Sequence, residues 1–148
     1  MFLDNKSFET IIDSTPLISL DLVVKNKQGQ ALLGLRTNRP ALNWWFVPGG
    51  RIQKNESMSV AFSRLCLNEL GLALSIEQAK FIGPFEHFYP DSVFGENVST
   101  HYVVLAYEIT VDATELSLPT EQHSEYQWFD IKALKEQSRV HKHSQWYF

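Results

Sequence analysis

The sequence predicts an α/β fold in which a mixed β-sheet is covered by helices on its faces. Segments 17–25 and 31–35 are rich in Leu, Ile and Val and flank a turn at 26–29, which is typical of a β-hairpin. A helix predicted over 57–70 separates this hairpin from the strands that follow. Hairpins combined with one long crossover helix indicate a mixed sheet between helical layers. A chain of 148 residues buries roughly 68–70% of its unfolded surface, so we expect a single domain over 1–148.

Two further elements are predicted before the crossover helix. A short amphipathic helix is expected over 5–13, because apolar residues recur there at helical spacing before a Ser-Thr-Pro stop. A short aromatic strand at 44–47 then leads to the pair Gly49-Gly50. This pair opens a loop that runs to Glu56 and feeds the crossover helix.

The second half of the chain is predicted to alternate strands with short helical turns. Strands are expected over 80–89, 101–110 and 126–129, with a polar loop at 119–125 and a helix from an Asp130 cap through Leu134. Ser75 and Gln78 have the spacing of a capping box over one helical turn. Segment 140–148 is expected to be helical or irregular, with His141 and His143 as tail residues. Its last three aromatic residues could pack at a dimer interface.

Charge and composition favour a small partner. Lys and Arg number 13 against 17 Asp and Glu, which gives a formal net charge of −4. We find no cluster of Lys and Arg, so the sequence lacks the electrostatic footprint of a nucleic-acid-binding protein.

The cysteine count and the hydropathy pattern indicate the cellular compartment in which the protein is expected. The single Cys66 excludes an intramolecular disulfide, and we interpret it as a small buried hydrophobe rather than a nucleophile. No stretch approaches the ~20 apolar residues that a membrane span needs, and the first residues lack a signal-peptide pattern. A cytoplasmic location with no membrane partner is the expectation.

The glycine loop and the crossover helix carry a spaced motif of charged residues. They resemble the Nudix hydrolase signature, G-x5-E-x7-R-E-U-x-E-E-x-G-U, in which U is a bulky aliphatic residue. The matching positions are Gly50, Glu56, Arg64, Glu69, Gly71 and Leu72. Leu65 and Asn68 stand where the signature has glutamates, so two of the usual metal-face carboxylates are missing.

The same departure is found in one Nudix branch, the GDP-mannose mannosyl hydrolases, which this chain resembles over nearly its whole length. The similar stretches begin at Met1-Phe2-Leu3 and include 14–17, 34–40, 45–51, 87–89, 100–105 and Glu121-Gln122-His123. The resemblance implies the α/β/α sandwich of the superfamily, which agrees with the fold class predicted above.

The resemblance also implies a metal site. Magnesium prefers near-octahedral oxygen coordination with few protein ligands plus phosphates and water. The implied ligands are the Gly49 carbonyl, Glu69 and Gln122, which would hold one Mg²⁺ per subunit, with Mn²⁺ as a substitute. Outside this resemblance, Glu69 would be interpreted as a solvated glutamate at a helix end and Gln122 as an ordinary loop amide.

Members of this branch cleave a carbon–oxygen bond. GDP leaves as a stabilised anion, so one general base and cations on the diphosphate suffice. His123 suits the base, since an unperturbed imidazole titrates near pH ~6.5, and Arg36 and Arg51 suit the diphosphate. The competing interpretations are a solvated loop histidine and two surface arginines.

Several residues are candidates for holding the substrate. Asp21 interrupts an apolar strand and is a candidate sugar-hydroxyl acceptor, unless alternation turns it to solvent. His87 and Tyr102 lie on strands, where burial as satisfied polar groups is the rival interpretation. The resemblance implies that Phe2, Leu3 and Phe8 line the guanosine pocket, with the partner subunit of a homodimer as one possible source. Glu56 and Arg64 are expected to form a structural ion pair.

The predicted function is Mg²⁺-dependent hydrolysis of GDP-mannose, with GDP-glucose as a second candidate, to GDP and free sugar with inversion. Two alternatives stay open. One is a Nudix hydrolase that cuts the P–O bond of a nucleoside diphosphate. The other is an inert Nudix module that binds a nucleotide sugar.

Overall fold

A computed structural model describes residues 3–119 and 123–148, with the backbone alone at His123 and Ser124. Seven strands form one mixed sheet: β1 (Leu17–Lys25), β2 (Ala31–Arg36), β3 (Trp45–Phe46), β4 (Gly49–Arg51), β5 (Lys80–Tyr89), β6 (Thr100–Thr110) and β7 (His123–Phe129). The path β3-β2-β1-β6-β5 is extended by β4, which pairs with β1, and by β7, which pairs with β2. Strands β1 and β6 are parallel and the other pairs are antiparallel, so the predicted mixed sheet is confirmed.

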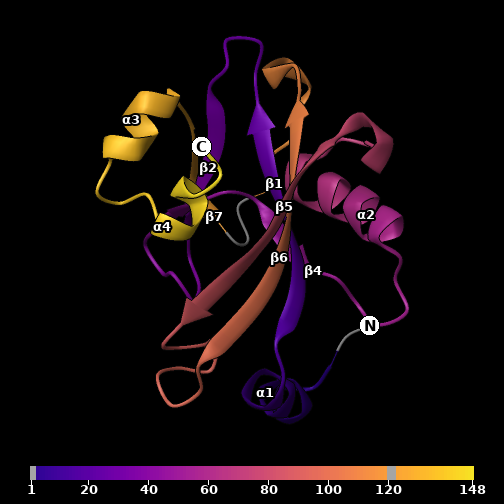
Figure 1. Cartoon of the computed structure of the whole chain (residues 1–148), viewed down its shortest axis with the longest axis vertical. Coiled ribbons are helices and arrows are strands. Elements are labelled where there is room, and N and C mark those ends of the chain that lie inside the picture. The colour runs from indigo at the N-terminus through magenta and orange to yellow at the C-terminus, as the bar shows by residue number, and fades with distance from the viewer. Residues whose placement is uncertain (1–2, 120–122) are drawn as a thin grey trace.

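Helices lie on both sides of this sheet (Figure 1). They are α1 (Asn5–Ser14), α2 (Met58–Leu70), α3 (Ile131–Glu136) and α4 (Lys142–Gln145), with 3-10 turns at Ile76–Gln78 and Ala113–Glu115. One apolar cluster joins α2 to the sheet through Phe62, Leu65 and Leu70. A second cluster joins the opposite face to Leu134, Val140 and Tyr147. The predicted covering of the sheet by helices is therefore confirmed.

Strand β1 is buried on both faces because both helical layers cover it. Its residues from Ser19 to Val24 are all buried, including Asp21 at 6% exposure. Simple alternation would have turned Asp21 to solvent, and in this central strand no face is open to solvent. A carboxyl group is thus held within the protein next to β4.

The local signals for the helices are confirmed by their caps. The Ser57 side chain accepts from the Val60 N–H at the start of α2, and Gly71 ends the helix in the left-handed region at φ 70°. At Ser75, the backbone N–H donates to the Gln78 side chain, as in the predicted capping box. Cys66 is fully buried in α2 and its pKa is raised to about 12 by burial, which suits a small hydrophobe.

Apart from shifts of one or two residues at other element ends, the structure differs from the prediction at β4, at β7 and at the Asp130 cap. Gly49–Arg51 is a strand rather than a loop, because it pairs with Ser19–Asp21 of β1. A Cβ on Gly49 would lie 2.4 Å from the Leu20 carbonyl oxygen, so only glycine allows this approach. Strand β7 begins at His123 rather than Tyr126, since it continues the antiparallel ladder along β2.

The third difference concerns Asp130. It precedes α3 as predicted, yet its side chain makes no capping hydrogen bond. Instead its carboxylate accepts from the Gln30 side chain at 3.1 Å, which ties α3 to the β1–β2 turn.

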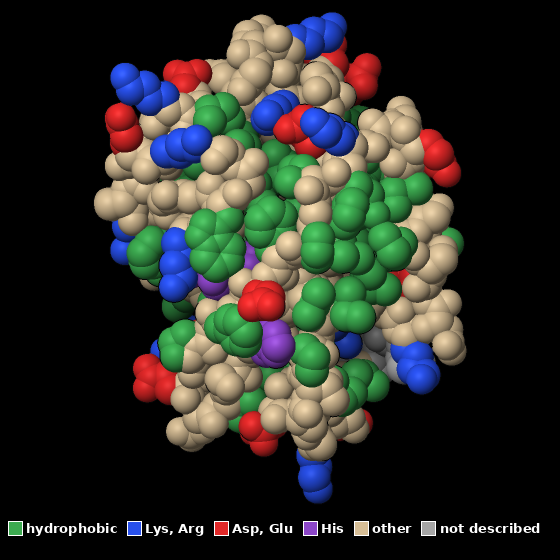
Figure 2. All heavy atoms as spheres, viewed as in Figure 1, with side chains coloured by type: hydrophobic (Ala, Val, Ile, Leu, Met, Phe, Trp, Pro, Cys, Tyr) green, Lys and Arg blue, Asp and Glu red, His purple; other side chains and the backbone are tan. Residues whose placement is uncertain are grey.

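The surface shows mixed chemistry. Figure 2 shows Lys and Arg side chains scattered over the viewed face, with hydrophobic side chains gathered near its centre. Large exposed apolar side chains include Val60, Leu67, Phe81 and Phe88. Among the described residues, no helix has the length and apolar character needed to cross a membrane.

Candidate active site

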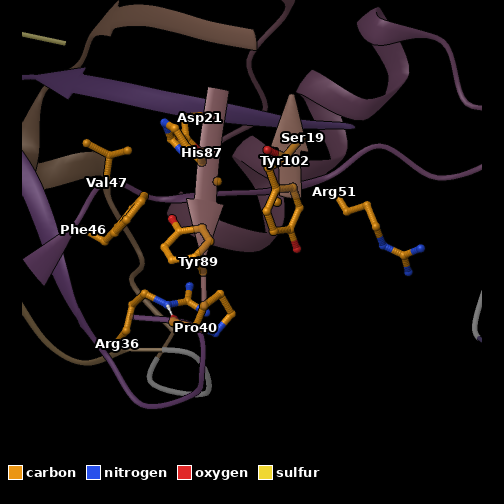
Figure 3. Close-up of a pocket in the computed structure, with 12 residues that line it drawn as sticks. Ser19, Asp21, Arg36, Pro40, Phe46, Val47, Arg51, His87, Tyr89 and Tyr102 are labelled. Atoms are coloured by element: carbon orange, nitrogen blue, oxygen red, sulfur yellow. Dashed lines mark hydrogen bonds between the residues drawn. The ribbon is translucent and has the colours of Figure 1, made fainter. Parts of the chain in front are cut away.

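A cavity opens beside the centre of the sheet, where β1, β2, β4, β5 and β6 meet (Figure 3). Its lining residues are Ser19, Asp21, Arg36, Pro40, Phe46, Val47, Gly49, Gly50, Arg51, His87, Tyr89 and Tyr102. Six of these were predicted as site residues from the sequence: Asp21, Arg36, Gly49, Arg51, His87 and Tyr102. The fold therefore brings together residues that are widely separated along the chain.

Asp21 is the carboxyl group of this cavity. Burial raises the pKa of Asp21 to about 7, while the hydrogen bond from Tyr147 and the charge of Arg36 both act to lower it. The Tyr147 hydroxyl donates to Asp21 Oδ2 at 2.5 Å. The group is thus positioned as an acceptor at the base of the cavity.

His87 lies next to Asp21 in a stack of aromatic rings. Its Nε2 atom is 3.1 Å from the Tyr147 hydroxyl, and its ring is parallel to that of His143 at 4.2 Å between centroids. Burial lowers the pKa of His87 to about 4, with a smaller contribution from His141. The imidazole is therefore neutral at physiological pH and can accept a hydrogen bond at one nitrogen.

The two arginines of the cavity differ in direction. Arg36 Nε donates to the Pro40 carbonyl at 2.9 Å, which holds its guanidinium close to Asp21 and Tyr89. The Arg51 side chain extends away from the other labelled residues in Figure 3. Its guanidinium carbon lies 4.5 Å from the Phe8 ring centroid, a cation–π contact with α1.

Two tyrosines add neutral hydroxyl groups to the cavity. Burial raises the pKa of both Tyr89 and Tyr102, so each keeps its proton and can donate a hydrogen bond. With the Arg36 guanidinium, these donors favour an anionic or hydroxyl-rich ligand.

The predicted metal ligands are only partly within the described residues. Gly49 lines the cavity, and Glu69 is buried at 5% exposure on α2 without lining it. Burial raises the pKa of Tyr126 in β7, and the Glu69 charge adds to this shift, so the Glu69 carboxylate lies near that tyrosine. Gln122 lies outside the described residues. Within the described ranges, no group of three His, Cys, Asp or Glu side chains could hold a metal ion.

The donor chemistry still fits magnesium. A backbone carbonyl at Gly49 and one carboxylate at Glu69 are hard oxygen ligands, and magnesium usually completes its shell with phosphates and water. A Cβ on Gly49 would also lie 2.6 Å from Asp21 Oδ1, so glycine at this position lets β4 pack directly against Asp21.

The predicted ion pair between Glu56 and Arg64 is present. Arg64 Nε and Nη2 donate to the two Glu56 oxygens at 2.6 and 2.9 Å. Arg64 also donates to the Arg51 carbonyl, and the Glu56 carboxylate accepts from the Gln53 N–H. The pair therefore fixes the end of β4 and the following loop on α2, as expected of a structural role.

The remaining predicted residues lie around the cavity or outside the residues that the structure describes. Phe8 contacts Arg51 from α1, and Leu3 lines a separate groove between α1 and β4. Phe2 lies outside the described residues. The backbone of His123 is paired with Arg36 across β7 and β2, so it lies near the cavity, although its side chain is not described.

Tyr89, His143 and Tyr147 are polar residues at or beside the cavity that sequence reasoning did not assign to the site. Tyr89 shares a strand face with His87 because the two are separated by two positions, and this alternation could have identified it. The interpretation of His143 as a tail residue is wrong, since it is 2% exposed against His87. Tyr147, considered for a dimer interface, is instead buried within its own chain. Long-range packing, which leaves no local signal, brings both into contact with residues that line the cavity.

Comparison with known proteins settles the family. Residues 15–148 match the NUDIX domain family. The chain belongs to the Nudix family. Its mixed sheet with helices on both faces is therefore the Nudix fold, as the sequence predicted.

Relatives of this Nudix protein include hydrolases and a glycan-pathway protein. It is 42% identical over 123 residues to the low-salt glycan biosynthesis protein Agl8 of Haloferax volcanii, covering 83% of this chain and 76% of that protein. It is similar in structure to a MutT NUDIX hydrolase from Burkholderia pseudomallei, with a TM-score of 0.72, 23% identity and coverage of 90% and 96% of the two chains.

A third similar structure contains a metal ion. It is a bifunctional NMN adenylyltransferase/ADP ribose pyrophosphatase from Francisella tularensis, complexed with AMP and a Mn ion. The TM-score is 0.64 at 18% identity, with coverage of 94% of this chain and 42% of that one. Family membership supports hydrolase activity, and the low identities to solved structures establish the fold alone.

Proposed function

We propose that this Nudix protein hydrolyses GDP-mannose to GDP and free sugar, with water attacking the anomeric carbon and inversion of configuration. GDP-glucose is the second candidate substrate. In this proposal Asp21 and His87 bind the sugar. The diphosphate is bound by Arg36, Arg51 and Tyr102. Phe2, Leu3 and Phe8 are proposed for the guanosine.

The composition of the α2 face carries this proposal. Of three signature positions for metal-binding glutamates, Leu65 is buried in the apolar cluster and Asn68 is exposed, which leaves Glu69. The Leu65 side chain also fills the space beside Gly50, where a Cβ would lie 2.5 Å from Leu65 Cδ2. A single carboxylate supports one metal on the diphosphate better than a metal cluster that delivers water to phosphorus.

The proposed reaction transfers one proton and breaks one bond. His123 accepts a proton from water while the water oxygen bonds to the anomeric carbon. The bond between that carbon and the GDP oxygen breaks, and its electron pair stays on the β-phosphate. No general acid is needed, because GDP is a stable anion whose developing charge Arg36 can offset.

Magnesium would be held by the Gly49 carbonyl, Glu69 and Gln122, and it would supply positive charge to the diphosphate. Asp21 accepts hydrogen bonds from sugar hydroxyls and thereby orients the anomeric carbon. The Tyr102 hydroxyl, which keeps its proton, donates to a phosphate oxygen.

The relatives bear on the choice between reactions. Glycan biosynthesis, in the name of the Haloferax protein, uses activated sugars, which supports a nucleotide-sugar substrate. The Francisella protein, named as an ADP ribose pyrophosphatase, is an example of the competing P–O cleavage within the same fold.

Turnover in heavy-oxygen water distinguishes the two reactions. We expect the label on the anomeric hydroxyl of the sugar and none on GDP, with the β-anomer of mannose appearing first. The measurement is mass spectrometry of both products, together with NMR of the sugar during the first turnovers. Label in a phosphate product, or release of GMP with sugar-1-phosphate, would assign ordinary Nudix chemistry to this chain.

A further inference from the structure

Tyr147 supplies a hydrogen-bonding group behind the cavity that the proposed reaction does not use. Its side chain is 8% exposed, and its ring packs edge-on against Phe85 at 4.9 Å between centroids. Helix α4, which precedes it, is tied to β3 and the following residue. The His141 N–H donates to the Trp45 carbonyl, and the Val47 N–H donates to Ser144 Oγ. The Tyr147 hydroxyl is thus delivered to a fixed point at the centre of the sheet.

That hydroxyl joins the two side chains proposed to meet the sugar. It donates its single proton to Asp21 Oδ2, so toward His87 Nε2 at 3.1 Å only its oxygen is available as an acceptor. With Asp21 ionised, above its pKa of about 7, His87 therefore carries a proton on Nε2, which leaves Nδ1 as its acceptor. The parallel ring of His143 at 4.2 Å restricts rotation of the His87 ring.

We propose that Tyr147 is a positioning residue that fixes the Asp21 carboxylate and the Nε2–H tautomer of His87. The pair then presents one set of acceptors to the hydroxyl groups of a hexose. This inference rests on the proposed function for the role of the sugar, while the hydrogen-bond arrangement itself can be tested without substrate. A hydroxyl donor bound to such a pre-oriented acceptor pair needs no rearrangement of the protein.

The kinetic test uses Tyr147→Phe, which removes the hydroxyl and keeps the ring. Tyr107→Phe is the matched control, because Tyr107 is a buried tyrosine that packs on Phe62 beyond the cavity. We expect kcat/KM for GDP-mannose to fall about 10- to 100-fold in Tyr147→Phe and to stay within twofold in the control. The dissociation constant and binding stoichiometry for GDP alone should change less than about twofold. Unchanged hydrolysis of GDP-mannose, or an equal loss of GDP binding, would overturn the positioning role.

The second measurement is nitrogen-15 NMR of the histidine rings at pH 8, with His87 assigned by a His87→Gln variant. We expect wild-type His87 to be the Nε2–H tautomer alone, and Tyr147→Phe to contain a substantial Nδ1–H population. A wild-type Nδ1–H tautomer, or the same single tautomer in both proteins, would overturn the inference. Failure of the wild type to hydrolyse GDP-mannose would refute the proposed function, and the NMR result would still decide the role of Tyr147.

Discussion

Carboxyl groups on the two sides of β4 lie in opposite surroundings. On the α2 side, hydrogen bonds from Arg64 lower the pKa of Glu56, so this pair is fully charged. On the α4 side, burial raises the pKa of Asp21 to about 7, and its hydrogen-bond donor is the neutral Tyr147 hydroxyl. One side holds a charged ion pair, and on the other side a buried carboxyl group near Arg36 is hydrogen-bonded to an uncharged tyrosine.

The difference indicates how the site divides its tasks. The ion pair of Glu56 and Arg64 holds the loop before α2 against that helix, and Glu69 is a further, buried carboxylate of α2. Neutral hydrogen-bonding groups suit a ligand that has hydroxyls and no charge, because a buried unpaired charge would be costly there. Under the proposed function, the sugar would meet Asp21 and His87, the diphosphate would meet Arg36 in the same cavity, and the Glu56–Arg64 pair would only support the loop behind β4.

The largest expected effect tests whether Asp21 only orients the sugar or also acts as the general base. A carboxyl with a pKa of about 7 could itself serve as a general base, so Asp21 competes with His123 for that role. We expect His123→Gln to lower kcat by about 10³-fold, within the usual 10²–10⁴ range for a positioned base, with little change in KM. The measurement is steady-state kinetics with GDP-mannose from pH 5.5 to 9.

His101→Gln is the control for that variant, since His101 stacks on the exposed Phe88 away from the cavity. Asp21→Asn should weaken turnover but keep the acidic limb of the pH profile. If His123→Gln retained its rate while Asp21→Asn removed the acidic limb, Asp21 would be the base and the division of tasks would fail.

A second, smaller effect concerns the pH dependence of stability on the α4 side. Burial lowers the pKa of His87 and His141 to about 4 and that of His143 to about 3. Between these values and the unfolded value near ~6.5, the unfolded chain binds more protons, so acid favours unfolding. Asp21 acts in the opposite direction, because its folded pKa is raised, but three imidazoles outweigh one carboxyl.

We therefore expect the free energy of unfolding to fall as the pH drops from 6.5 to 5, by on the order of 1 kcal/mol per pH unit after allowance for solvent screening. Urea denaturation at several pH values measures this slope. His143→Asn should make the slope smaller. An equal slope in wild type and His143→Asn would show that His143 is not held neutral.

The fold could be predicted largely from local signals. The two cap residues of α2, Ser57 and Gly71, directly flank the helix in the sequence, so its limits were predicted closely. Strands β1 and β5 match their predicted limits for the same reason, as apolar runs bounded by turn residues. Strand β4 was missed because three residues with two glycines have no strand pattern, and pairing with β1 alone creates it.

The candidate site, like the fold, contains residues that the sequence predicts and residues that only the tertiary structure brings together. Arg36 and His87 lie in stretches that resemble the family, whereas Asp21 was found because it interrupts an apolar strand, and the structure brings the three together. The contact between Asp21 and Tyr147 spans 126 positions, and no periodicity relates them. Residues of this kind require the tertiary structure, because their proximity depends on how α4 packs on the sheet.

The smallest expected effect concerns the ion pair between Glu56 and Arg64. Its ion pair is partly buried, with side-chain exposures of 27% for Arg64 and 10% for Glu56, and the same carboxylate also accepts from a backbone N–H. We expect Glu56→Gln to lower the free energy of unfolding by about 1–2 kcal/mol, the range for hydrogen bonds to charged groups after partial screening. The control, Glu108→Gln, breaks the more exposed pair with Lys25 and should cost less than about 1 kcal/mol.

Magnesium affinity, measured by calorimetry with GDP present, should be nearly unchanged in Glu56→Gln and strongly reduced in Glu69→Gln. The reverse order of magnesium affinities would place the metal on the loop carboxylate, and the paired charges of α2 would then be part of the metal site rather than its support.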